Sequence, residues 1–152
     1  MSASSVRASE WTPARIFLLV SALYHLPLGI LGLLVDQTFP LSAGAAAHAS
    51  SGHLFGVFET NGWHSVAGLG VGAFSLFYVV RPRHARAAAL NLGIGHVLIV
   101  IALAIWDPST FLFASNGADQ VIHTTTALGG IASGLLTPKG SGGRVAMQGA
   151  SP

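Results

Sequence analysis

The sequence predicts an all-α fold, an integral membrane bundle of four helices. Three observations support this prediction. Charged residues make up only 8% of the chain, against about 25% in soluble domains, and the mean hydropathy is +0.63. Four apolar stretches are each long enough to cross a bilayer as a helix, which takes about 20 residues. If the four stretches cross a membrane, all seven lysines and arginines lie on the same side of it.

The first apolar stretch predicts a helix over residues 14–35. Thr12 and Pro13 come directly before it and are typical of a helix N-cap and first helical residue. Pro27 lies inside the stretch, and neighbouring helices in a membrane bundle satisfy the carbonyl group that it frees. Residues 1–13 are expected to form a cytoplasmic tail.

The second apolar stretch, residues 54–80, is the longest in the chain. Its first half carries Glu59, Asn61 and His64, whereas a core helix of a soluble protein would show a polar face along its whole length. We interpret the stretch as a membrane-spanning helix inside the bundle, with polar groups near one surface. Glu59 lies close to the outer end, so a structural or interfacial role is expected for it.

Two further helices are predicted over residues 87–106 and 118–137. Pro82 ends the second stretch, and a proline also follows the fourth. Residues 138–152 are rich in glycine and serine and are expected to form a disordered cytoplasmic tail. The four spans and their connections use most of the chain, so the sequence predicts one membrane domain over residues 14–137.

The basic residues predict the orientation in the membrane. They fall before the first helix, between the second and third, and after the fourth, and the other two connections carry none. By the positive-inside rule, both termini are cytoplasmic and the protein is a multi-pass protein of the plasma membrane. Such scattered charges do not form a nucleic-acid patch, so the expected partners are the lipid bilayer and a second copy or a larger membrane complex. The basic residues are Arg7, Arg15, Arg81, Arg83, Arg86, Lys139 and Arg144.

A short internal repeat relates the second and fourth stretches. His64 and His123 both begin the pattern His-[Ser/Thr]-x-x-[Ala/Gly]-Leu-Gly, and each comes early in its stretch. His25 and His96 lie near the middle of the first and third stretches. Duplication of a helical hairpin would explain this symmetry.

With these stretches in view, the chain resembles a family of small bacterial membrane proteins catalogued as domain of unknown function 4383. The resemblance rests on LFGVFETNGWHSVAGLGVG, which contains Asn61 and His64, and on NGADQVIHTTTALGG, which begins the fourth helix with Ala-Asp-x-x-x-His. It covers roughly residues 15–137 and implies a four-helix architecture. The family has no assigned activity, and His25 and His96 do not belong to its pattern.

The four central histidines are the candidate site. At about 1.5 Å rise per residue, they lie about 15 to 24 Å from the cytoplasmic helix ends, within one slab about 10 Å thick. In a bundle, all four can therefore point at a common axis. Polar and small residues at helical spacing from each histidine are expected to lie on the same face of its helix. The candidate cofactor-binding residues are His25, His64, His96 and His123; the supporting polar residues are Glu59, Asn61, Asn91, Gln120 and Thr126; the helix-packing residues are Gly29, Gly32, Gly68, Gly72, Gly130 and Gly134.

The leading functional interpretation is a structural or accessory membrane protein in which histidine and amide side chains tie helices together. One alternative is binding of a b-type haem or a metal ion through paired histidines, since neutral imidazole suits both. A second alternative is transport of protons or a small solute. The chain has no cysteine, and it lacks the phosphate-loop, HExxH, EF-hand and nucleophile-elbow patterns, so an enzyme is not expected.

Overall fold

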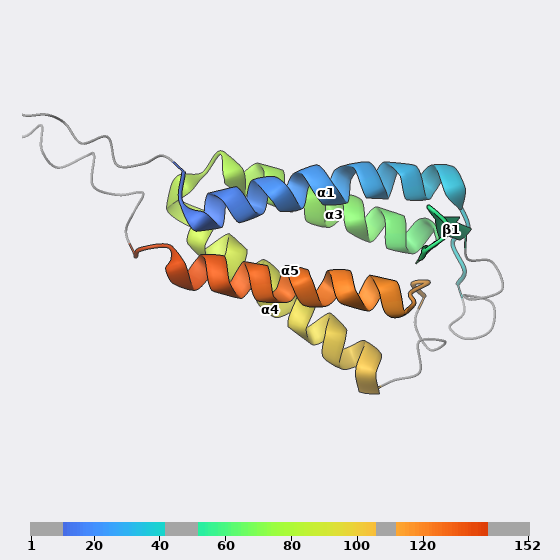
Figure 1. The fold of residues 1–152 in the computed structure, drawn as a ribbon. Coiled ribbons are helices and arrows are strands. Elements are labelled where there is room, and N and C mark those ends of the chain that lie inside the picture. Colours follow the sequence, from blue (N-terminus) through green and yellow to red (C-terminus); the bar gives the residue numbers. More distant parts are fainter. Residues whose placement is uncertain (1–10, 42–51, 106–111, 140–152) are drawn as a thin grey trace, which may run out of the picture.

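The computed structural model describes residues 11–41, 52–105 and 112–139, and this part of the chain is mostly helical, as predicted. Four helices lie side by side, and a small β-hairpin lies at the end opposite the beginning of α1 and the end of α5 (Figure 1). The elements in order are α1 Pro13–Val35, β1 Gly52–Leu54, β2 Phe58–Thr60, α3 Gly62–Val79, α4 Pro82–Ile105 and α5 Gly117–Leu136.

Capping residues fix the beginnings of α1 and α5. Thr12 Oγ1 accepts a hydrogen bond from the N–H of Arg15 at 3.4 Å, and Pro13 is the first residue of α1, as predicted. The Asn116 side chain accepts from the backbone N–H of Asp119, and the Asp119 carboxylate accepts from the N–H of Asn116. This reciprocal capping box holds the Asp119 side chain at the start of α5.

The predicted start of the second helix at residue 54 is wrong. Helix α3 begins at Gly62, and the residues before it form the antiparallel hairpin β1–β2, which includes Glu59. Glu59 is therefore a strand residue rather than a helical one. Asn61 is the N-cap of α3, and its side chain accepts a hydrogen bond from the N–H of His64 at 2.9 Å.

The turn of the hairpin explains why this segment is not helical. Phe55 and Gly56 both have positive φ angles, 56° and 71°. The N–H of Val57 donates to the carbonyl oxygen of Leu54 at 3.2 Å. Two successive left-handed residues closed by this bond form a type I′ turn, which connects paired strands.

The predicted start of the third helix at residue 87 is also wrong, because α4 begins at Pro82. Proline lacks the N–H that a first helical residue leaves unused, so it ends one helix and begins the next. The connection is correspondingly short, and the N–H of Arg81 donates to the carbonyl oxygen of Tyr78 at 3.1 Å.

The bundle consists of two helical hairpins, because α1 packs mainly against α3 and α4 packs mainly against α5. A Cβ added at Gly29 would lie 2.8 Å from the backbone oxygen of Ser65, and one at Gly130 would lie 2.7 Å from the Cα of Gly93. These backbones approach too closely for a side chain, so glycine is required there. At Gly68 an added Cβ would meet only ordinary contacts at 3.8 Å. Added Cβ atoms would also clash with side chains of a neighbouring element at Gly32, Gly72 and Gly134.

Apolar side chains cover much of the surface, and polar side chains occupy much of the interior. Leu23 and Leu34 are 67% and 72% exposed, whereas Asn61 and Ser75 are fully buried. Helices α1 and α4 are long and apolar enough to cross a membrane, and among the described residues no other helix meets that requirement. A small apolar core lies at the end where α1 begins, formed by Ala14, Leu18, Val79, Ala85, Ala88, Ala89 and Leu92.

Candidate functional site

Four histidines, one from each helix, come together inside the bundle. The ring centroids of His25 on α1 and His96 on α4 are 5.9 Å apart. Those of His96 and His123 on α5 are 5.6 Å apart, and those of His123 and His64 on α3 are 6.1 Å apart. The four rings thus form a continuous series across the interface between the two hairpins, which we call the histidine cluster.

Backbone carbonyl groups orient three rings of the histidine cluster. Nδ1 of His25 and Nδ1 of His96 each lie 2.9 Å from the carbonyl oxygen four residues earlier in the same helix. Nδ1 of His64 lies 2.7 Å from the carbonyl oxygen of Ala114. A carbonyl only accepts, so Nδ1 carries the proton and Nε2 of the neutral ring is an acceptor. Within the described residues these Nε2 atoms form no hydrogen bond, and the buried Nδ1 of His123 has no partner there either.

Two serines extend the polar contacts from the histidine cluster toward the other end of the bundle. Ser21 Oγ lies 3.2 Å from Nδ1 of His25. Ser75 Oγ donates to Ser21 Oγ at 3.0 Å, and Ser75 is fully buried. These bonds join α1 to α3 inside the first hairpin.

A cavity of about 70 Å³ adjoins the histidine cluster near the β-hairpin, and we call it the polar cavity. Asp119 is 4% exposed, so its carboxylate is almost completely removed from solvent. The buried hydroxyl group of Tyr24 has no hydrogen-bond partner among the described residues. The polar side chains on the cavity wall include Tyr24, His25, Glu59, His64, Asp119 and His123.

A second cavity of about 180 Å³ shares His64 and His123 with the polar cavity. Its remaining wall is almost entirely apolar, so we call it the apolar cavity. His64 and His123 thus line both cavities. The other residues that line it are Ala67, Ile99, Ala102, Leu103, Phe113 and Ser115.

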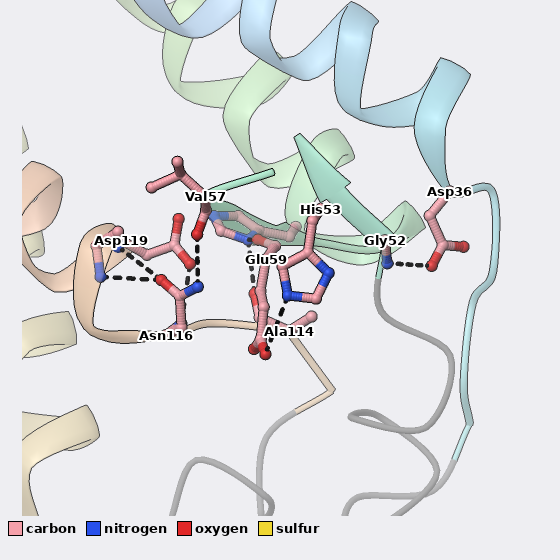
Figure 2. A network of polar contacts seen from close by, with 10 residues as sticks. Asp36, Gly52, His53, Val57, Glu59, Ala114, Asn116 and Asp119 are labelled. Carbon is pink, nitrogen blue, oxygen red and sulfur yellow. Dashed lines mark hydrogen bonds and ion pairs between the residues drawn. The ribbon is translucent and has the colours of Figure 1, made fainter. Parts of the chain in front are cut away.

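Figure 2 shows how polar contacts join the β-hairpin to the start of α5. Asn116 Nδ2 donates to the carbonyl oxygen of Val57 at 2.7 Å. His53 Nε2 lies 3.9 Å from Glu59 Oε1, an ion pair when the imidazole is protonated. Residues of the β-hairpin line the polar cavity and supply Glu59 to its wall.

All four helices lie within the match to one known protein family. A family model described as domain of unknown function 4383 matches residues 9–136. The chain belongs to this family. The match includes all four helices and both cavities, and it confirms the resemblance seen in the sequence. No curated protein and no solved structure matches the chain.

In this family 4383 protein, the supporting polar residues proposed from the sequence lie in different surroundings. Glu59 lines the polar cavity, Asn61 caps α3, and Thr126 is buried on α5. Asn91 is exposed on α4 and Gln120 is half-buried on α5. Neither of these last two side chains forms a hydrogen bond within the described residues. Glu59 is thus the one member of this set on the wall of the polar cavity.

The histidine cluster is not a preformed coordination sphere. Over the described ranges, no group of three or more His, Asp or Glu side chains is arranged to hold a metal ion. The rings instead contact one another as neighbours, and their Nδ1 atoms are engaged mainly by carbonyl groups.

Sequence analysis assigned no role to Tyr24 or Asp119, although both line the polar cavity of the family 4383 protein. The spacing Asn116-x-x-Asp119 is that of a capping box, and it would have placed an acid at the start of α5. For Tyr24 no signal is present, because its position in the cavity depends on how α1 packs against α5.

Proposed function

We propose that this protein is a multi-pass integral membrane protein with four spans, in which buried polar side chains hold two helical hairpins together as a structural or accessory component. The observation that carries the proposal is the reversed distribution of polar and apolar residues. Leu135 and Val20 are 65% and 59% exposed, whereas Asp119 and His96 are 4% and 3% exposed. Water-soluble proteins bury their large apolar residues and rarely bury acids.

The two most apolar helices support the same proposal. Within their apolar segments, only 33% of α1 and 28% of α4 is buried inside the bundle. A core helix of a water-soluble protein passes the same length and hydropathy requirement but is mostly buried. Lipid tails accept the exposed Leu, Ile and Val side chains without cost, so this exposure suits a bilayer.

The charge distribution supports cytoplasmic termini and a location in the plasma membrane. All lysines and arginines of the described residues lie at the end of the bundle where α1 begins and α5 ends (Figure 1). The β-hairpin end carries none among those residues. The positive-inside rule then places the hairpin outside. These basic residues are Arg15, Arg81, Arg83, Arg86 and Lys139.

Hydrogen bonds between the hairpins support a structural role for the buried polar groups. Asn61 Nδ2 donates to the carbonyl oxygen of Leu112 at 2.8 Å near the β-hairpin. At the opposite end, the N–H of Ala14 donates to Thr137 Oγ1 at 2.9 Å. Such bonds contribute about 0.6 kcal/mol each in membrane proteins, and together they fix how the hairpins meet.

Membrane fractionation tests the proposal. After an alkaline carbonate wash of cell membranes, the protein is expected to stay in the pellet, because integral proteins resist this treatment. A matched soluble protein expressed at the same level should be released. Recovery of this protein in the supernatant would contradict the proposal.

Metal binding through paired histidines is a second candidate function. Donation of Nδ1–H to a carbonyl group is the arrangement that orients metal-binding histidines. Ring centroids 5.9 Å apart, as in His25 and His96, suit two Nε2 ligands on one ion, since metal–nitrogen bonds are about 2 Å long. Stoichiometric zinc or copper that is lost in His96→Ala would support this candidate, and a Soret band would instead indicate haem. Colourless, metal-free protein would exclude both.

Transport is the weakest of the three candidates. The bonds from His25 through Ser21 to Ser75 extend the polar contacts inward. Ser75 is nevertheless fully buried, and within the described residues no further side-chain bond leads from it to the surface. A flux of protons or solute into proteoliposomes, above that into protein-free vesicles, would reverse this ranking.

A further inference from the structure

Asn91 places an amide without a partner on the outer surface of α4, near the middle of the helix. It is the tenth residue of Pro82–Ile105, so at about 1.5 Å rise per residue it lies about 14 Å from the beginning of α4. The residue is exposed, and its side chain forms no hydrogen bond within the described residues. The hydrocarbon core of a bilayer is about 30 Å thick, so this short side chain reaches neither interface. An amide in hydrocarbon is costly unless another group bonds to it.

Small residues lie on both sides of Asn91 on the same face of α4. Ala87 and Gly95 come four residues before and after it, one helical turn in each direction. Ala87 is exposed, and a Cβ added at Gly95 would have nothing within 4 Å. The packing of the single chain therefore does not require glycine at Gly95, in contrast to Gly130. Small residues at this spacing let a helix from outside the chain approach α4 closely.

A groove of about 460 Å³ lies between α3 and α4, and Asn91 and Gly95 form part of its wall. Helix α4 packs mainly against α5 and much less against α3, which leaves this groove open. On the α3 side, a Cβ added at Gly70 would also have nothing within 4 Å. His96 lines the groove, is 3% exposed, and directs Nδ1 to a carbonyl group, so its Nε2 is an acceptor without a partner among the described residues. A lipid acyl chain would fill the groove but would satisfy neither the amide nor this nitrogen.

A second copy of the chain supplies the complementary group. The Asn91 amide carries partial positive charge on Nδ2 and partial negative charge on Oδ1, so two facing amides are complementary in charge and each can donate to the other. The basic residues give both copies the same orientation in the membrane. A two-fold axis along the membrane normal therefore brings Asn91 of both copies to the same depth. We propose that two copies associate through α4, each α4 lying in the groove of the other copy, with the two Asn91 side chains hydrogen-bonded near the axis.

This inference rests on the proposed membrane location, because the exposed amide is costly in hydrocarbon and not in water. It goes beyond that proposal by naming a partner and the surface that binds it. The two can fail separately. Carbonate-resistant protein that stays monomeric in a bilayer would refute the pairing alone, whereas release by carbonate would refute the membrane location and the pairing with it.

Energy transfer between labelled copies in phosphatidylcholine liposomes measures the association. The full chain has no cysteine of its own, so Lys139→Cys carries a donor or an acceptor fluorophore, and the two preparations are mixed at a series of protein-to-lipid ratios. We expect the dissociation constant to rise at least tenfold in Asn91→Leu, which removes the amide, and in Gly95→Leu, which fills the groove. Thr125→Val is the matched control, because Thr125 is exposed on α5 and its hydroxyl donates to the carbonyl oxygen of Val121 in its own helix at 2.8 Å. Its dissociation constant should equal that of the parent.

Unfolding of single chains separates association from folding. In micelles that hold one chain each, Asn91→Leu should unfold with the same free energy as the parent, because the amide forms no hydrogen bond within the described residues. Weaker association with unchanged unfolding would support the pairing. Unchanged association in both Asn91→Leu and Gly95→Leu would overturn it, and so would a parent protein that stays monomeric at every protein-to-lipid ratio.

Disulfide formation between copies locates the interface. Ala87→Cys lies one turn from Asn91 on the same face of α4, so an added copper–phenanthroline oxidant should link two copies in membranes. Val20→Cys is the matched control, since Val20 is 59% exposed at a similar depth but lies on α1. We expect the linked dimer to form in Ala87→Cys and to be several-fold less abundant in Val20→Cys. Equal linking of the two variants would overturn the inference, and a monomer that retains lipid in the groove would assign the groove to acyl chains instead.

Discussion

Asn61 offers the sharpest test of how the hairpins are held together. Its Oδ1 accepts from the N–H of His64 at 2.9 Å and caps α3, and its Nδ2 donates to the carbonyl oxygen of Leu112 at 2.8 Å. The residue is fully buried. Asn61→Ala therefore removes a helix cap and a bond between the hairpins in one change.

The expected loss in the free energy of unfolding of Asn61→Ala follows from these two contacts. Loss of an asparagine N-cap costs about 1 kcal/mol, and the bond to Leu112 contributes about 0.6 kcal/mol or more where its partner stays buried. The emptied space of a fully buried side chain adds to this loss. We expect the free energy of unfolding to fall by about 2 to 3 kcal/mol.

Asn91→Ala is the matched control for this prediction. Asn91 is exposed on α4 and forms no side-chain hydrogen bond among the described residues. Alanine has the higher helix propensity, so stability should stay the same or rise slightly. Unfolding in mixed detergent–SDS micelles, followed by circular dichroism, gives both free energies. Equal losses in Asn61→Ala and Asn91→Ala would refute the proposed role of Asn61.

Further substitutions test the helix contacts and the histidine cluster. Gly130→Ala should lower the free energy of unfolding by about 1 to 3 kcal/mol, because its Cβ would lie 2.7 Å from the Cα of Gly93; Gly95→Ala, with nothing within 4 Å of its added Cβ, should not. His64→Ala should lower the thermal midpoint in detergent, since it removes the bond to a carbonyl group across the hairpins, whereas His53→Ala, exposed on the β-hairpin, should leave it unchanged. If Gly95→Ala and His53→Ala also lower stability, the losses in Gly130→Ala and His64→Ala do not come from these specific contacts.

The sequence predicted the first and fourth helices best. The predicted ranges 14–35 and 118–137 agree with α1 and α5 to within one residue at each end. Thr12 and Pro13 supply the signal for α1, and the apolar stretch with the proline that follows it supplies the signal for α5. Pro82 gives two conflicting signals, because proline stops one helix and suits the first turn of the next.

The β-hairpin escaped prediction for a physical reason. Its residues are mostly apolar and aromatic, so they extend the hydropathy of α3 without a break. The turn depends on left-handed φ angles at Phe55 and Gly56. Phenylalanine rarely adopts a left-handed conformation, so it gives no sequence signal for this turn. The error also put Glu59 in a helix, although β2 brings it to the polar cavity.

The candidate site was only partly visible in the sequence. One histidine per helix at similar depth led to a predicted common axis, and the four rings do lie within 5.6 to 6.1 Å of their neighbours in the series. Tyr24 and Asp119 reach the polar cavity through the packing of α1, α3 and α5. Contacts of that kind depend on helix rotation, which sequence periodicity fixes only approximately.

Site-specific labelling of single cysteines tests the membrane bundle most directly, because the chain contains no cysteine of its own. Phe55, 69% exposed at the turn of the β-hairpin, and Lys139, exposed after α5, mark the two ends of the bundle. A membrane-impermeant maleimide is expected to label Phe55→Cys only in right-side-out vesicles and Lys139→Cys only in inside-out vesicles. Labelling of both cysteines from the same side would contradict the four-span bundle.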